Sequence, residues 1–476
     1  MSAAVSRAIA WFRRDLRLHD HPALTAALAA ADEVLPLFVF DDVLLGGRFA
    51  SANRAWFLLG SLSGLRGDLR ARDGDLWLRR GRPAEAVSAL ASEVGAEAVY
   101  ASADAGPYAR RRDEEVEAVL AARGIRFQVS PGTLVAEPGS ILSAAGRPYS
   151  VFTPFHRAWE AAPRRAVLQA PERVRVPVGA PDPGSVPSLA DLGFAGPTAS
   201  PDLLPEPGEA AARSRLDRWA STGLSRYAER RDLLAVGGTS RLGQDLHLGL
   251  LSPTEVLERC GGPGDGPRVY ASELCWRDFY AHVLWHWPHA ARRSFRRVYD
   301  AVPWRNDPEA FAAWTDGRTG YPVVDAAMRQ LRATGWMPNR ARMIVASFLA
   351  KDLLIDWRAG EAHFMAQLVD GDLASNNGGW QWAASTGTDA QPYFRVFNPV
   401  AQGERFDPEG GYVRRWVPEL ARVAARYVHA PWTMAPDVQR QAGCVIGQDY
   451  PPPIVDHAAA RERALFAYRS VRPALN

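Results

Sequence analysis

The stretch Val34-Leu35-Pro36-Leu37-Phe38-Val39-Phe40 is an uninterrupted run of seven apolar residues. A strand of a parallel sheet that is covered on both faces has this pattern, because neither of its faces meets water. It is preceded by a shorter apolar run, Ile9–Phe12, and by a helical pattern with proline in its first turn, Pro22–Ala31. The order strand, helix, strand predicts a parallel βαβ unit with a right-handed connection.

The same alternation continues to about residue 135. Three more helical patterns and three more strand patterns follow in turn: Ala52–Arg70, Leu76–Leu78, Pro83–Val94, Ala98–Ala101, Tyr108–Ala122 and Arg126–Val129. We therefore expect residues 1–135 to form a doubly wound, Rossmann-like α/β domain with a parallel sheet. No Gly-x-Gly-x-x-Gly follows the first strand, which disfavours a standard dinucleotide site there.

The remainder of the chain has a different character. Ten of the 36 prolines lie between Ala161 and Ala210, so we expect residues 136–212 to be a long extended connector. From residue 213 to 476 strand signals are absent and helical ones dominate. One helix should start at Tyr321-Pro322 and stop at Gly335, and Asn339–Ile355 should form another. The second domain is therefore predicted to be all-helical.

Composition limits the class of protein. A net charge of +3 over 476 residues excludes a wholly basic coat for nucleic acid. The three cysteines are too few for a disulfide framework or a four-cysteine zinc site, and no metal site is expected. The sequence shows neither a signal peptide nor an apolar span of about 20 residues. We expect a cytoplasmic monomer without an obligate protein partner.

The helical half is rich in tryptophan and locally basic. Eleven of the 16 tryptophans lie between Trp276 and Trp432, and the segment 277–342 holds eleven arginines against six acidic residues. Arginine neutralises phosphate and tryptophan stacks on unpaired bases, so the combination suits a nucleic-acid backbone with an exposed base. A solvated helix face above an aromatic core would have the same composition.

Two polar segments are candidates for ligand binding. The segment 239–243, Thr-Ser-Arg-Leu-Gly, indicates a turn entering a helix, where free backbone N–H groups can hold a phosphate; a simple helix cap is the alternative. The segment 370–382, Asp-Gly-Asp-Leu-Ala-Ser-Asn-Asn-Gly-Gly-Trp-Gln-Trp, is the densest polar stretch. Its carboxylates and carboxamides need partners, which favours a polar ligand over a junction of helix caps.

These segments, taken with three others, resemble the photolyase/cryptochrome family. The other three are Trp11-Phe12-Arg13-Arg14-Asp15-Leu16-Arg17-Leu18, Trp276-Arg277-Asp278-Phe279-Tyr280 and the segment 319–329, Thr-Gly-Tyr-Pro-Val-Val-Asp-Ala-Ala-Met-Arg. The resemblance runs in order over the chain except for the proline-rich connector. It implies a class I photolyase for cyclobutane pyrimidine dimers, with an N-terminal antenna domain and a C-terminal helical domain that binds FAD.

The resemblance also implies roles for individual residues. The residues expected to hold FAD, whose active form would be reduced FADH⁻, are Tyr227, Thr239, Ser240, Arg241, Leu242, Gly243, Arg277, Arg342, Asp370, Gly371, Asp372 and Asn376. Arg342 would pair with Asp370, and Asn376 would lie at flavin N5 as part of the catalytic set. The residues expected at the flipped-out dimer are Glu273, Trp276, Asn339 and Met343. Their rings, polar edges and thioether suit a pair of damaged thymines.

Further residues are implied in DNA contact and electron transfer. UV-damaged DNA would be contacted by Arg231, Glu273, Trp276, Asn339, Arg340, Arg342, Trp382 and Gln402, with an affinity that falls as salt rises. Trp380, Trp357 and Trp304 match the family's electron-transfer chain from the surface to the flavin. Without the resemblance, these three would be interpreted as core residues.

The sequence also distinguishes among members of the family. A (6-4) photolyase would carry histidine within 339–343, and cryptochromes would have aspartate or cysteine where this chain has Asn376; a blue-light photoreceptor without repair activity is the alternative function. The antenna residues would be Asp41, Arg54, Asp104 and Arg112. They favour 8-hydroxy-5-deazaflavin over methenyl-tetrahydrofolate or FMN, although His247 stands where the deazaflavin-binding group often has lysine.

Overall fold

Five strands form the sheet of the N-terminal domain in a computed structural model that describes residues 5–471. They are β1 (Val5–Phe12), β2 (Ala31–Phe40), β3 (Trp77–Arg80), β4 (Ala98–Ser102) and β5 (Arg126–Ser130). Their order is β3-β2-β1-β4-β5, and every pair is parallel. The order reverses between β1 and β4, which is the switch point of a doubly wound sheet. The predicted fold class is confirmed.

Helices cover both faces of this sheet. They are α1 (Pro22–Ala30), α2 (Asp42–Leu45), α3 (Ala52–Arg70), α4 (Pro83–Val94) and α5 (Pro107–Ala121). Ile9 and Trp11 pack in one core with α4 and α5, while Ala10 and Phe12 pack in another with α1 and α3. This division follows from the alternation of side chains along β1. The predicted helix at Pro22–Ala31 ends one residue earlier, because β2 already starts at Ala31.

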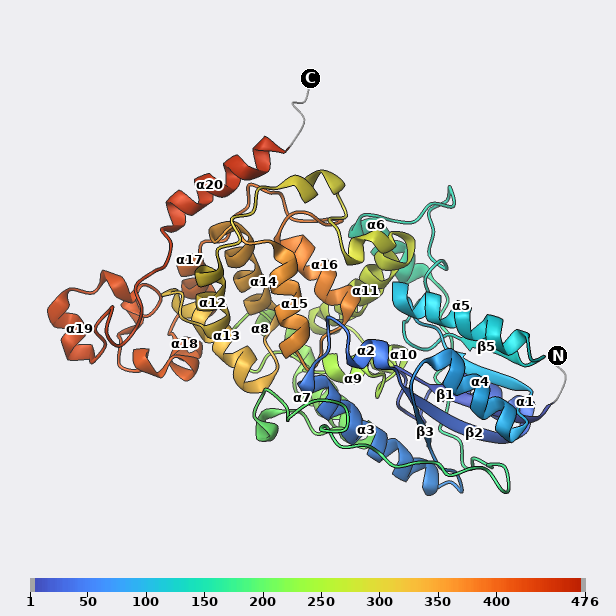
Figure 1. Cartoon of the computed structure of the whole chain (residues 1–476). Coiled ribbons are helices and arrows are strands. Elements are labelled where there is room, and N and C mark those ends of the chain that lie inside the picture. Colours follow the sequence, from blue (N-terminus) through green and yellow to red (C-terminus); the bar gives the residue numbers. More distant parts are fainter. Residues whose placement is uncertain (1–4, 472–476) are drawn as a thin grey trace.

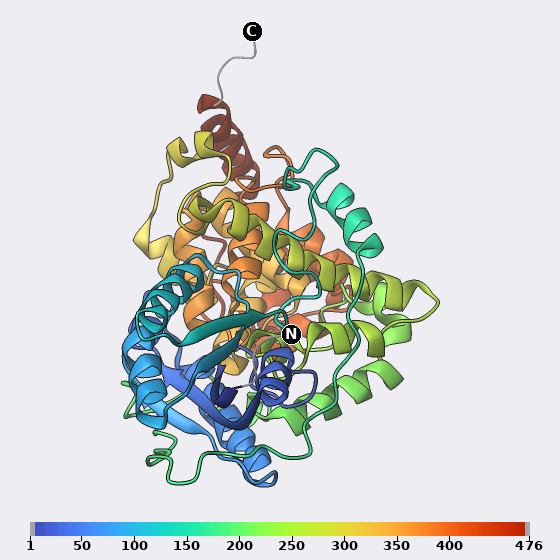
Figure 2. The same cartoon turned by 90° about the vertical axis from the view of Figure 1, so that its right-hand side faces the viewer.

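The predicted connector is more structured than its prolines suggested. Residues 136–212 contain α6 (Phe152–Ala161) and the start of α7, and two side chains of α6, Phe155 and Trp159, are buried. The proline-rich part is extended but packed, since the N–H of Val34 donates to the carbonyl of Arg175 and that of Leu78 donates to the carbonyl of Pro183. Figure 2 shows this segment passing from α6 along the sheet domain.

The second domain is helical, as predicted, and lies beside the sheet domain (Figure 1). Its helices are α7 (Glu209–Thr222), α8 (Tyr227–Arg230), α9 (Gly243–His247), α10 (Pro253–Arg259), α11 (Asp265–His286), α12 (Pro308–Asp316), α13 (Pro322–Thr334), α14 (Asn339–Ser347), α15 (Trp357–Gln367), α16 (Leu373–Ala383), α17 (Pro399–Phe406), α18 (Gly411–Trp416), α19 (Pro436–Ala442) and α20 (His457–Ser470). At the centre, α16 packs against α11, α14 and α15.

Two of the predicted helices can be compared with the helices of the structure. The helix that starts at Pro322 ends as expected before Gly335, which takes the left-handed conformation with φ of 63°. The helix predicted over Asn339–Ile355 is shorter, because α14 ends at Ser347 and a π-type turn follows at Phe348–Asp352. In this turn the N–H of Leu353 donates to the carbonyl of Phe348 at 3.0 Å, and the buried Lys351 donates to Ser385 Oγ at 2.9 Å.

Candidate active site

A cavity of about 380 Å³ opens in the helical domain among α11, α14, α15 and α16. Thirteen of the predicted site residues line it, and six further residues do so as well. The predicted ones are Arg231, Glu273, Trp276, Arg277, Asn339, Arg342, Met343, Asp370, Gly371, Asp372, Asn376, Trp380 and Trp382, and the others are Tyr280, Ala346, Phe364, Leu368, Ser375 and Gly379. Helical spacing could have found two of them, since Tyr280 lies four residues after Trp276 and Gly379 three after Asn376.

One wall of the cavity is built by α11 and α14. Glu273, Trp276 and Tyr280 follow the spacing of one helix face, so they point the same way from α11. Glu273 Oε1 accepts from Arg231 Nη1 at 2.6 Å. Burial raises the pKa of Glu273, and the charge of Arg231 opposes that shift. Asn339 and Met343 are one turn apart on α14 and complete the wall.

Carboxylates form the opposite end of the cavity. Arg342 Nη2 donates to Asp370 Oδ2 at 2.7 Å, which is the pair that the sequence analysis expected. The other oxygen, Asp370 Oδ1, is buried and has no hydrogen-bond partner among residues 5–471.

Asp372 caps α16, because its Oδ1 accepts from the N–H of Ser375 at 3.0 Å. The second oxygen of Asp372 joins the two domains. Arg14, which follows β1, donates through Nη2 to Asp372 Oδ2 at 2.5 Å, and His247 Nδ1 lies 3.7 Å from the same oxygen. Burial alone would raise the pKa of the Asp372 carboxyl, but Arg14, His247 and Arg277 together hold it well below its usual range. Asp372 is therefore a fixed negative charge beside the cavity.

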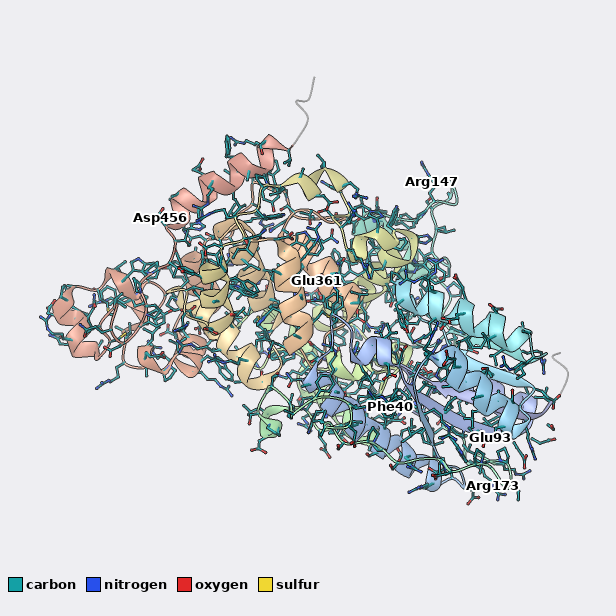
Figure 3. The ribbon with its side chains drawn as sticks, viewed as in Figure 1. Phe40, Glu93, Arg147, Arg173, Glu361 and Asp456 are labelled. Atoms are coloured by element: carbon teal, nitrogen blue, oxygen red, sulfur yellow. The ribbon has the colours of Figure 1, made fainter. Side chains whose placement is uncertain are left out.

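Asn376 is oriented by the neighbouring helix α15. Its Nδ2 donates to the backbone carbonyl of Glu361 at 3.1 Å, which leaves the carboxamide oxygen available to a ligand in the cavity. Glu361 Oε1 accepts from Asn377 Nδ2 at 2.8 Å, and Glu361 Oε2 accepts from Arg48 Nη2 at 3.0 Å. Figure 3 shows Glu361 near the centre of the molecule. Nothing in the sequence pattern pointed to Glu361 or Arg48.

Glu361 should make stability depend on pH. Its side chain is fully buried, and burial raises its pKa to about 7 from a usual value of 4.5. The folded state therefore holds this proton to a higher pH than the unfolded state, and the free energy of unfolding falls as pH rises through this window. We expect Glu361→Gln to gain about 3 kcal/mol over the parent between about pH 5 and about pH 8.

Denaturant unfolding of the parent and the variant at the two pH values measures this gain. Glu93→Gln, at an exposed position on α4, controls for the loss of one negative charge. A stability difference between Glu361→Gln and the parent that is the same at both pH values would contradict the prediction.

Several predicted flavin residues lie behind the cavity wall. Tyr227 is buried in a cluster of rings with Trp219 and Tyr270. The turn 239–243 enters α9, as predicted, and Arg241 in it has φ of 53°. A Cβ on Gly243 would lie 2.7 Å from Asp370 Oδ2, so the turn packs directly against a lining residue. A ligand that extends past Asp370 would reach this turn.

Two predicted DNA contacts also lie outside the lining. Arg340 pairs with Asp232 at 2.8 Å, and its guanidinium lies 4.4 Å from the ring centroid of Phe406. Gln402 is on the same helix as Phe406, α17, and is half-buried. The side chain of Arg340 therefore reaches from α14 to α17, the helix that carries Gln402.

The three tryptophans of the predicted electron route lie on segments that contact one another in turn: α16, α15, and the loop of Trp304 beside the start of α15. Trp380 lines the cavity and rests on α15, where a Cβ on Gly360 would lie 2.1 Å from its ring. Trp357, fully buried, is the first residue of α15. The half-buried Trp304 is next to Arg305, whose N–H donates to the carbonyl of Leu354, just before α15. The indole Nε1 atoms of all three tryptophans are buried and have no acceptor in the part of the chain described here.

The predicted antenna residues are engaged within the protein. Asp41 accepts from the hydroxyl of Tyr108 at 2.6 Å, and the guanidinium of Arg112 lies 5.1 Å from the ring of Trp11. Arg54 instead reaches the helical domain, where it donates to the carbonyls of Met365 and Leu368. Asp104 lies 3.6 Å from Arg14 at the domain interface.

The cavity has the chemistry that a flavin dinucleotide requires. Phe364, Leu368 and Trp380 offer apolar surface to the faces of a ring system, and Asn376 offers a carboxamide to its polar edge. Arginines at 277 and 342 can offset phosphate charge. The unpaired Asp370 Oδ1 is an acceptor that a ligand hydroxyl or N–H would satisfy. The residues present therefore fit FAD.

Comparisons with known proteins identify the family. The family model described as FAD binding domain of DNA photolyase matches residues 270–470, and the model DNA photolyase matches residues 8–175. A deoxyribodipyrimidine photo-lyase of Streptomyces griseus is 44% identical over 467 residues, which is 96% of this chain and 98% of that protein. The chain belongs to the DNA photolyase family. The photo-lyase of Escherichia coli (strain K12) is 41% identical and covers 98% of both chains.

Solved structures of the family superpose closely. A class III photolyase from Agrobacterium tumefaciens gives a TM-score of 0.92 at 39% identity, and the match covers 99% of this chain and 98% of that one. A Synechocystis cryptochrome gives 0.90 at 29% identity, covering 99% and 100%. The predicted family, fold, enzyme class, dimer-repair function and FAD-binding domain are thereby confirmed. The class I assignment, the antenna chromophore and the roles of single residues stay predictions.

Two further observations concern the residues that the structure describes. Between residues 5 and 471 no helix combines the length and the hydropathy that crossing a membrane requires. In the same range no three His, Cys, Asp or Glu side chains are grouped so as to hold a metal ion.

Proposed function

We propose that the cavity is where this photolyase-family enzyme repairs cyclobutane pyrimidine dimers in DNA with light. One observation carries the proposal. A single cavity joins a wall suited to damaged bases, with Glu273, Trp276 and Asn339, to a wall suited to a flavin, with Asp370 and Asn376. An electron leaving one ligand would then have only a short path to the other.

The base-binding wall would hold a dimer that has left the DNA helix. Trp276 and Trp382 offer rings for stacking, and stacking is insensitive to base sequence. Glu273, held by Arg231, can accept from an imide N–H, and Asn339 can donate to a carbonyl. Met343 adds adaptable apolar contact. Arg231 and Arg342 at the same cavity, with Arg340 and Gln402 beyond it, would meet the strand and its phosphates.

The flavin-binding wall positions the cofactor. Asp370, Gly371, Asp372, Arg277 and Arg342 would hold FAD, and the turn 239–243 with Tyr227 would support its distal part. In its reduced, photoexcited form, bound FAD supplies the electron that splits the cyclobutane ring and takes it back afterwards. The carboxamide oxygen of Asn376 can accept from N5–H, and its amide stays on Glu361. The apolar side chains of Phe364, Leu368 and Trp380 would exclude water from the flavin ring.

The proposal also covers the antenna chromophore, the reduction of the flavin, the subclass of the enzyme, its oligomeric state and its localisation. The N-terminal domain would bind an antenna chromophore, 8-hydroxy-5-deazaflavin, with Asp41 after the end of β2 and Arg112 over Trp11 of β1. Trp304, Trp357 and Trp380 would return the flavin to its reduced form. We assign the protein to class I and expect a cytoplasmic monomer.

Illumination of the purified, fully reduced protein with dimer-containing oligothymidylate tests the proposal. We expect loss of the dimer in the light and none in the dark, with no sequence preference around the lesion. Glu273→Gln should slow repair, because glutamine has one acceptor oxygen where glutamate has two and cannot hold Arg231 by charge. If the reduced parent protein leaves the dimer intact in the light, a blue-light photoreceptor without repair activity becomes the better assignment.

A further inference from the structure

Trp276 is stacked face to face on Phe152, a residue of α6. The two ring centroids are 3.6 Å apart and the ring planes differ by only 5°. Aromatic pairs generally prefer offset-stacked or edge-to-face arrangements over face-to-face stacking at this distance. The stack therefore needs supports outside the two rings, and the structure provides them.

Phe152 is anchored by the loop that follows α16. Its backbone N–H donates to Asp389 Oδ2 at 3.0 Å, and the hydroxyl of Thr388 donates to the carbonyl of Ser150. Asp389 has φ of 45°, in the left-handed region that aspartate enters more readily than most other non-glycine residues. The same loop leaves α16 shortly after Trp382, which lines the cavity. The start of α6 is thus held by two hydrogen bonds to the loop that follows α16, a helix that lines the cavity.

The ring of Phe152 is also held from the side. Phe279, three residues after Trp276 on α11, meets Phe152 edge-on at 5.7 Å and meets Trp276 edge-on at 5.6 Å. Phe279 is fully buried, so it gives both rings a rigid neighbour. With one face of the indole covered by Phe152, only the other face and the edges of Trp276 remain for a ligand in the cavity.

We propose that Phe152 is a positioning residue for the damaged bases. It covers the rear face of Trp276, fixes the plane of the indole, and leaves the opposite face ready for stacking. This inference rests on the proposed function, because it assumes that Trp276 stacks on the dimer. A fixed indole spares the ligand the entropy of ordering it, so the gain appears as affinity for damaged DNA.

The test compares Phe152→Leu with the parent in the flavin-containing protein. Leucine keeps apolar volume but removes the ring face. We expect binding of dimer-containing oligothymidylate to weaken about three- to tenfold, the worth of one aromatic pair, while binding of undamaged oligothymidylate is unchanged. Light-driven reduction of the flavin without DNA should also be unchanged. Phe152→Tyr, which keeps the ring, should bind dimer-containing DNA like the parent.

Phe155→Leu is the matched control. Phe155 lies one turn further on α6, is buried, and meets Phe279 at 5.2 Å. Loss of this ring loosens the same helix, so an equal loss of dimer affinity in both leucine variants would overturn the positioning role. Unchanged dimer affinity in Phe152→Leu would do so as well.

Failure of the proposed lesion site and failure of the proposed role of Phe152 would give different results. If the parent protein itself binds damaged and undamaged strands equally, the proposed lesion site fails, whatever Phe152 does. If Phe152→Leu yields no flavin-containing protein, Asp389→Ala removes the anchor and keeps the ring. It should weaken dimer binding in the same direction, and parent-like dimer binding by Asp389→Ala would overturn the proposal.

Discussion

Trp304→Phe is expected to abolish most light-driven reduction of oxidised flavin in this protein, while repair by enzyme reduced beforehand stays near the parent rate. Trp304 would be the outer end of the route, and phenylalanine is far harder to oxidise than tryptophan. The packing supports the order of the route. The segment of Trp304 is fixed to α15 by two hydrogen bonds, from the N–H of Arg305 to Leu354 and from the N–H of Asp356 to Asn306.

The measurement follows flavin absorbance under blue light with an external reductant, and separately the loss of dimer in the pre-reduced protein. Trp432→Phe is the matched control, since Trp432 is half-buried like Trp304 but packs on Tyr321, away from α15. It should behave like the parent in both assays. An equal loss of photoreduction and repair in Trp304→Phe would refute the proposed route.

Asp372→Ala is expected to destabilise the protein by about 3–5 kcal/mol and to release the flavin, because the change leaves buried cations without their counter-charge. Arg14 and Arg277 are the cations that face this carboxylate, and α16 loses its cap. The carboxyl of Asp372 has a pKa far below its usual 3.8. Its contribution to stability is therefore complete above about pH 4 and is lost only as pH falls through the lower, folded-state pKa.

Urea unfolding near neutral pH and the flavin content after gel filtration measure the effect. Asp356→Ala is a matched control, since Asp356 also caps a helix, α15, and pairs with one arginine, Arg358, but is more exposed. Loss of that cap should cost about 1 kcal/mol. Similar losses in the two variants would show that capping, and not charge burial, accounts for Asp372.

Local patterns were enough to predict much of this fold. The parallel sheet follows from apolar runs such as Val34–Phe40, and the helix ending at Gly335 follows from a residue that tolerates positive φ. Site residues that are close in sequence, such as Asp370, Asp372 and Asn376, were found together for the same reason. Their spacing within one short segment already places them together around the start of α16.

Long-range contacts were beyond the sequence pattern. Arg48 meets Glu361 across 313 residues, and Arg14 meets Asp372 across 358. Neither pair leaves a periodic signal. The proline-rich composition around residue 170 predicted an extended connector over residues 136–212. It gave no sign of α6, whose first residue, Phe152, stacks on Trp276. Single-sequence reasoning finds elements and motifs, whereas partners between domains depend on how these elements pack.

The buried indole N–H groups of Trp304, Trp357 and Trp380 have a consequence for the proposed route. An oxidised indole is far more acidic at nitrogen than a neutral one, and it can lose that proton to a nearby acceptor. In the described part of the chain these three N–H groups have none. Electron transfer between these tryptophans would therefore occur without loss of a proton. Each transfer step would be reversible, because deprotonation would not trap the radical on one indole.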